Sequence, residues 1–300
     1  MRPLLLWTLI ASSFGIPPLL ALRADKQHQT YLAAEEYRKA IKINPDEPDL
    51  FVGLGTKEVE VWQYADGLVD LQLGQLGSIY DKDGLEAHAD ALRVFGRGRE
   101  AADLRLSAVW SSRDRREVRL RADAVADLRA AGKWSEAEEA WLDAYARFPV
   151  APLIHAEGAL LYADMGDLAT ARFHADLAAV SAVIPRRVLL ALATVCFLEG
   201  DFTNAKAQIA ELRSENPLSM EGILLDAEFQ FATGDAQSAW KLVDGPRWKA
   251  SDQPDAMALR ASLLHTLGQE SEAKQLIDRA MALYPHHRKV QQAFTAIGSL

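Results

Sequence analysis

Residues that could carry out chemistry are few and scattered in this chain. Its seven histidines include one adjacent pair, His286 and His287, and its single cysteine, Cys196, lies in the apolar stretch LLALATVCFLEG. The sequence contains no glycine-rich phosphate loop, G-x-S-x-G elbow, H-E-x-x-H motif or C-x-x-C pair. A histidine pair ahead of a terminal helix is more often a solvated corner than a metal site. We therefore expect no catalytic residue, no metal site and no cofactor, and a protein that is not an enzyme.

Arginines offer a second kind of chemistry, the recognition of anionic groups. From Arg93 to Arg121 there are nine arginines and four acidic residues, whereas the whole chain has 33 Lys and Arg against 42 Asp and Glu, a net charge of −9. This acidic balance argues against a nucleic-acid partner. Two interpretations of these arginines are open. They form a solvated face that is paired with nearby acids, or they form a docking patch for an acidic partner or anionic lipid headgroups. The acids are Glu100, Asp103, Asp114 and Glu117, and the docking patch would comprise Arg93, Arg97, Arg99, Arg113, Arg115, Arg116 and Arg119.

The elements that must position these side chains repeat every 34 residues. Five glycines follow this spacing, and an alanine stands five residues after each of them. The glycines are Gly132, Gly166, Gly200, Gly234 and Gly268, and the alanines are Ala137, Ala171, Ala205, Ala239 and Ala273. A fixed period of this length predicts stacked helix–turn–helix units. The glycine would close the first helix at positive φ, and the small alanine would let the two helices approach closely.

This pattern resembles the tetratricopeptide repeat, a family with glycine and alanine at matching positions of a 34-residue unit. The resemblance implies an all-α fold, a right-handed α-solenoid of about eight helix–turn–helix repeats. Five clear units are expected in 118–287, after degenerate repeats in 25–117 and before a capping helix in 288–300. In the degenerate part Trp62 stands where a turn glycine is expected, and two extra residues precede residue 118. A rival register through Gly77 and Gly84 stays open.

Partner binding in this family uses the concave face, which the first helix of each unit lines. Transferred position by position, the resemblance predicts that the partner-binding residues are Leu190, Thr194, Phe197, Leu224, Glu228, Phe231, Ser262 and His265. It also places Arg129, Arg187 and Asp255 on this face. The apolar members would suit an amphipathic or extended peptide from another protein. The alternative is that Phe197 and Phe231 pack between helices.

The first 24 residues read as a separate apolar segment. Positions 4 to 22 are 19 residues without a charge, which would span about 28 Å as a helix and could cross a membrane. An uncleaved anchor is favoured over a cleaved signal peptide, because LALRA offers no small-x-small cleavage site. An apolar first helix packed on the solenoid is a further alternative.

Taken together, these features predict a non-enzymatic scaffold or adaptor that binds other proteins through its concave groove. We expect a single-pass protein of the bacterial inner membrane, with its repeats in the periplasm, holding subunits of an envelope complex. The alternatives are a cleaved, soluble periplasmic adaptor and, with less support, an enzyme built on a helical solenoid.

Overall fold

A computed structural model describes residues 18–75, 82–109, 112, 115–180, 186–215, 220–245, 248–249 and 253–298 of the chain. Within these ranges all regular secondary structure is α-helical, which confirms the all-α part of the predicted fold class. The helices of the first half are α2 (Pro18–Ile43), α3 (Pro48–Glu60), α4 (Tyr64–Gln75), α5 (Lys82–Val94), α6 (Gly98–Val109), α7 (Arg115–Ala130), α8 (Trp134–Arg147) and α9 (Pro152–Met165). Those of the second half are α10 (Leu168–Ala179), α11 (Arg186–Leu198), α12 (Phe202–Glu215), α13 (Met220–Ala232), α14 (Ala236–Val243), α16 (Pro254–Thr266), α17 (Glu270–Leu283) and α18 (Arg288–Gly298).

A tight turn of one geometry separates the two helices of each unit. The turn glycines have positive φ, from 68° at Gly132 to 92° at Gly234. Each glycine N–H donates to the carbonyl three residues earlier, and the next N–H donates to the carbonyl five residues earlier, as Gly166 and Asp167 do. These bonds satisfy carbonyls that the end of a helix leaves without partners.

Trp62 adopts this same turn without being glycine. Its φ is 67°, the only positive φ of a non-glycine residue in the described part of the chain, and Gln63 N–H donates to the Glu58 carbonyl. The turns at Trp62 and Gly96 are 34 residues apart, and those at Gly96 and Gly132 are 36 apart. The described turns therefore follow the register through Trp62 and Gly96, with two extra residues before the first clear unit.

Small residues occupy the helix crossings of the array, as the period predicts. The alanines that follow the turn glycines by five residues are fully buried. They are Ala101, Ala137, Ala171, Ala205, Ala239 and Ala273. Small side chains at a helix crossing let the two backbones approach closely.

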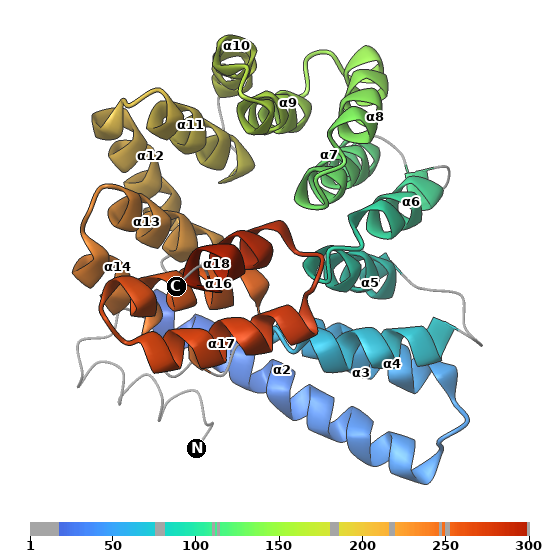
Figure 1. Cartoon of the computed structure of the whole chain (residues 1–300). Helices are drawn as coiled ribbons and strands as arrows, with labels where there is room; N and C mark the ends of the chain where they lie inside the picture. The colour runs from blue at the N-terminus through green and yellow to red at the C-terminus, as the bar shows by residue number, and fades with distance from the viewer. Residues whose placement is uncertain are drawn as a thin grey trace.

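The stacked units curve until the C-terminal helices meet the region of α3 to α5 (Figure 1). Val94 of α5 belongs to one apolar cluster with Met257, Tyr284 and Val290 of the C-terminal helices. The Phe95 and Tyr284 rings lie 5.0 Å apart between centroids, and the stacked rings of Trp62 and Trp248 lie 6.2 Å apart. The solenoid is thus a ring closed by side-chain packing. We call this apolar contact the seam.

The predicted membrane segment lies mostly outside the described residues. Residues 1–17 are not described, and residues 18–24 form the backbone of the first turns of α2. No helix among the described residues has the length and the apolar composition that crossing a bilayer requires.

A buried aromatic cluster joins α8, α9 and α10. Trp141 donates from Nε1 to the Ile154 carbonyl at 2.9 Å, and its ring meets His174 edge-on. His155 Nε2 lies 2.9 Å from the Pro149 carbonyl, and its Nδ1 lies 3.2 Å from Nδ1 of His174. Because a carbonyl only accepts, the hydrogen of neutral His155 is on Nε2, and His174 donates to its Nδ1.

We expect this histidine pair to make stability depend on pH. Burial lowers the pKa of both rings. The unfolded chain takes up protons near the ordinary histidine pKa of about 6.5, so the pair's contribution is complete above that pH and is lost as the pH falls below it. The loss should reach up to roughly 1.4 kcal/mol per histidine at about pH 5.5.

The measurement is the melting temperature at about pH 7.5 and about pH 5.5. The double variant His155→Leu/His174→Phe, whatever its stability at neutral pH, should lose less on acidification than the parent. An equal loss in parent and variant would show that the pair does not titrate in this range.

Candidate functional site

The first helices of the units line the inner side of the ring. Figure 1 shows α7, α9, α11 and α13 facing the centre, with α8, α10, α12 and α14 outside them. The capping helix α18 also lies on the inner side, packed against α16 and α17. The inner face is therefore the concave surface of the array.

Charged side chains cross this face in a continuous chain of ion pairs. We call them the inner ion-pair belt: Asp90, Arg93, Arg105, Asp123, Asp127, Arg129, Glu157, Asp164, Arg187 and Arg288. Its two halves are linked where Arg105 Nη1 lies 3.8 Å from Asp123. The belt holds five arginines and five acids, so it is neutral as a whole. It is unusual for a solenoid because it joins residues of units that are not neighbours.

At its first end the belt is buried. Arg105 of α6 donates from Nε to Asp127 of α7 at 2.7 Å and also bonds to Asp90 of α5. Arg105 is 2% exposed and Asp127 is fully buried. Burial raises the pKa of Asp127 to about 7, although Arg105 and Arg93 act against it.

In its middle the belt links units two repeats apart. Arg187 of α11 donates from Nη1 to Asp123 of α7 at 2.6 Å and lies 3.0 Å from Glu157 of α9. Glu157 in turn accepts from Arg129 at 3.1 Å. Burial opposes ionisation of Asp123, but the positive charges of Arg187 and Arg105 outweigh it and lower the pKa of this carboxyl.

The far end of the belt is held by the capping helix. Arg288 lies 3.8 Å from Asp164 of α9 and stacks over the Trp134 ring, 5.1 Å from its centroid. The next residue, Lys289, lies 2.5 Å from Glu228 and 3.5 Å from Asp255. Arg129, Arg187, Glu228 and Asp255, which the family pattern places on the concave face, therefore all lie in inner ion pairs.

The apolar residues predicted for the groove fall into separate groups. Leu224 belongs to the core cluster around Trp248 and the partly buried Phe231 packs against it, whereas Leu190 packs on a different cluster around α9–α11. The Phe197 ring lies 6.0 Å from Phe202 and 5.7 Å from Phe229. The four residues do not share one cluster, and their role in partner binding stays a prediction.

The polar residues of the predicted groove have local partners. Thr194 donates to the Leu190 carbonyl at 2.8 Å, and Ser262 to the Ala258 carbonyl at 3.0 Å. His265 Nδ1 lies 2.7 Å from Glu270.

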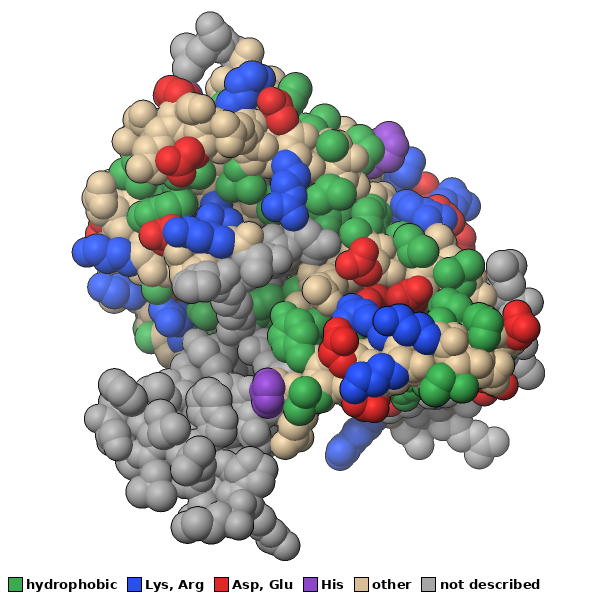
Figure 2. Space-filling model, turned by 90° about the horizontal axis from the view of Figure 1, so that it is seen from below, with side chains coloured by type: hydrophobic (Ala, Val, Ile, Leu, Met, Phe, Trp, Pro, Cys, Tyr) green, Lys and Arg blue, Asp and Glu red, His purple; other side chains and the backbone are tan. Residues whose placement is uncertain are grey.

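The predicted arginine patch is partly paired. Arg97 forms a bidentate pair with Glu100, Arg99 pairs with Glu136, Arg119 with Glu86, and Arg93 with Asp90 and Asp127. Arg115 and Arg116 make no ion pair with the described residues, and Arg113 lies outside them. Figure 2 shows basic and acidic side chains side by side on another face of the molecule.

Several residues of the belt were not predicted from the sequence. Arg105 was counted only in the arginine-rich stretch, and Asp123, Asp127 and Glu157 were not singled out. The sequence signal that could have indicated these residues is a charged residue within a helix that must be mostly buried, because charged residues are almost never fully buried unless they are paired. Among the described residues, no group of three or more His, Cys, Asp or Glu side chains could hold a metal ion.

Solved structures share this architecture. A tetratricopeptide repeat protein from Parabacteroides merdae matches 84% of this chain and 98% of its own, with 13% identity and a TM-score of 0.52. The chain has the tetratricopeptide-repeat fold. The APC/C hetero-tetramer Cut9–Hcn1 shares it over 84% of this chain, with 14% identity and a TM-score of 0.53, and the matched part is 49% of that neighbour's chain. The resemblance in the sequence is thus confirmed, although no family model and no curated protein matches the sequence.

The buried end of the belt should contribute strongly to the stability of this tetratricopeptide array. Arg105→Ala leaves the fully buried Asp127 without its nearest cation, and such a loss costs about 3–5 kcal/mol. Arg147→Ala is the matched control, because Arg147 is 56% exposed and lies 3.5 Å from Glu117. The control should cost less than about 1 kcal/mol. Urea unfolding monitored by circular dichroism measures both, and equal costs would contradict the role given to the belt.

Proposed function

We propose that this chain is a non-enzymatic scaffold that holds other proteins against the inner face of its ring. The observation that carries the proposal is the belt together with the Lys289 pairs. Several of these charged side chains remain within reach of water, such as Lys289 at 48% exposed and Glu228 at 33%. Charged groups on a concave surface select partners by complementarity and exclude wrong ones.

A known complex with this fold supports the proposal. The neighbour Cut9–Hcn1 is described as a hetero-tetramer, so an array of this fold associates with another protein there. Repeat arrays present an extended concave surface on a rigid frame. The predicted groove residues, from Leu190 to His265, and the arginine patch are the candidate contacts on this chain.

The proposal also includes the cellular location of the scaffold. The uncharged run from residue 4 to residue 22 is long enough to cross a bilayer. We place the chain in a bacterial inner membrane, anchored by this segment, with its repeats in the periplasm and envelope-complex subunits as partners. A cleaved, soluble periplasmic adaptor is the alternative.

The scaffold proposal predicts a partner that depends on the inner face. The tagged chain is recovered from detergent-solubilised membranes, and co-purifying proteins are quantified by mass spectrometry. Glu228→Lys reverses a half-exposed inner charge, and Glu272→Lys makes the same change at an exposed position of α17. We expect recovery of a stoichiometric partner to fall about tenfold with Glu228→Lys, a loss of about 1.4 kcal/mol, and to be unchanged with Glu272→Lys.

Two results would count against the scaffold. One is the absence of any stoichiometric partner under gentle conditions, and the other is an equal loss with both variants. Helical circular dichroism must be retained in both variants for the comparison.

The anchor proposal predicts that the full chain resists carbonate extraction from membranes and that deletion of residues 1–17 releases it. Intact mass separates the two forms of the proposal, because cleavage would remove about 24 residues. A full-length chain that carbonate extracts completely would reject the anchor.

A further inference from the structure

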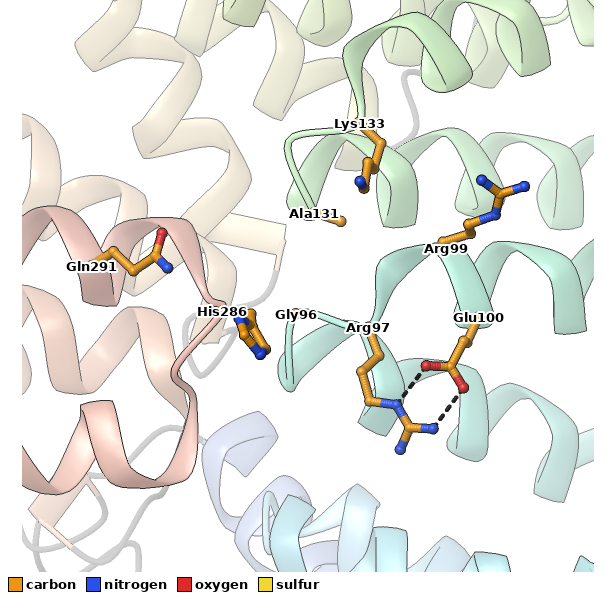
Figure 3. Close-up of a pocket in the computed structure, with 8 residues that line it drawn as sticks. All are labelled: Gly96, Arg97, Arg99, Glu100, Ala131, Lys133, His286 and Gln291. Carbon is orange, nitrogen blue, oxygen red and sulfur yellow. Dashed lines mark hydrogen bonds and ion pairs between the residues drawn. The ribbon is translucent and has the colours of Figure 1, made fainter.

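A cavity of about 340 Å³ opens beside the seam. Its lining comes from three places that are far apart in the sequence: the turn between α5 and α6, the turn between α7 and α8, and the start of α18 (Figure 3). The lining residues are Gly96, Arg97, Arg99, Glu100, Ala131, Lys133, His286 and Gln291. The size is at the lower end for small-molecule sites, which are clefts or cavities of about 300–1,000 Å³.

Positive charge dominates this cavity. The lining holds three cations, Arg97, Arg99 and Lys133, and one carboxylate, Glu100, in a chain whose net charge is −9. Arg99 pairs with Glu136 outside the lining at 2.8 Å. Glu100 binds two nitrogens of Arg97, Nε at 2.7 Å and Nη2 at 2.6 Å. The exposed Lys133 ammonium makes no hydrogen bond or ion pair with the described residues. Figure 3 shows Lys133 and His286 on opposite sides of the opening, on different elements.

The other units show how unusual this charge is. The residue directly after the turn glycine is an aspartate in three consecutive units: Asp167, Asp201 and Asp235. Each of these carboxylates accepts a backbone N–H three residues later. At the cavity the same position is Arg97 in one unit and Lys133 in the other. Two neighbouring units thus carry a cation where the next three units carry an anion, and both cations line one cavity.

We propose that this cavity binds the phosphate group of a small phosphate monoester, or inorganic phosphate itself. A planar guanidinium and a compact ammonium are the two side-chain groups best suited to phosphate oxygens. The imidazole of His286 and the amide of Gln291 supply further hydrogen-bonding groups from the opposite wall. Because the lining comes from both sides of the seam, a bound phosphate also ties α18 to the α5–α6 and α7–α8 turns. The site does not depend on the scaffold function proposed above.

The test is titration of the full chain with inorganic phosphate by calorimetry, at constant ionic strength, with acetate as the carboxylate comparison. We expect saturable binding of phosphate and none of acetate in the same range. Lys133→Ala and His286→Ala should each weaken phosphate binding about tenfold, the loss expected for one charge-assisted hydrogen bond. Lys274→Ala removes an equal charge from an exposed i,i+4 pair on α17 and should leave the affinity unchanged.

Hydrogen exchange of the backbone amides is a second measurement, and general screening of charges by salt would not change it locally. Phosphate should slow exchange together in residues 96–100 and 286–291, which contribute to the cavity lining from different elements. Vesicles containing phosphatidic acid separate the two sources of the ligand. Binding to vesicles that Lys133→Ala abolishes, without saturable binding of free phosphate, would assign the site to a lipid headgroup. Absence of both kinds of binding, or equal weakening by Lys274→Ala, would overturn the proposal.

Discussion

The reversal of the chain between paired helices is the constraint on which the rest of the structure depends. Every unit turns through one residue at positive φ, which glycine adopts without steric cost. Trp62 adopts it as well, with φ 67°, and its ring is held against Trp248 in the seam. A non-glycine residue persists in this conformation only when its surroundings impose it. The turn and the seam thus support each other at this position.

Most of the fold could be predicted from the sequence because its determinants are local. A glycine and an alanine five residues apart define one turn and one helix crossing, and both signals recur every 34 residues. The degenerate part was harder to assign, since a tryptophan such as Trp62 does not by its residue type predict a turn. Closure of the ring could not be predicted, because Val94 and Tyr284 are 190 residues apart and small changes in stacking angle, summed over many units, decide whether they meet.

The candidate site was predictable only where the family pattern supplied positions. Arg129, Arg187, Glu228 and Asp255 were placed on the concave face in this way, and all lie in inner ion pairs. Their partners were not predicted, because a pair such as Arg187 and Asp123 joins residues 64 apart in the chain. Helical periodicity tells which residues are buried, but it does not tell which buried charges neutralise each other.

The closed seam changes how the molecule responds to force. An open solenoid can extend under force, since each unit touches only its neighbours and the ends are free to separate. Here the tilted contact between the Phe95 and Tyr284 rings closes the array, and the belt connects α7 with α11 through the Arg187–Asp123 pair. A force on one unit is therefore transmitted to the units on both of its sides and through the seam. We therefore expect the closed array to resist extension more than an open array of the same units would.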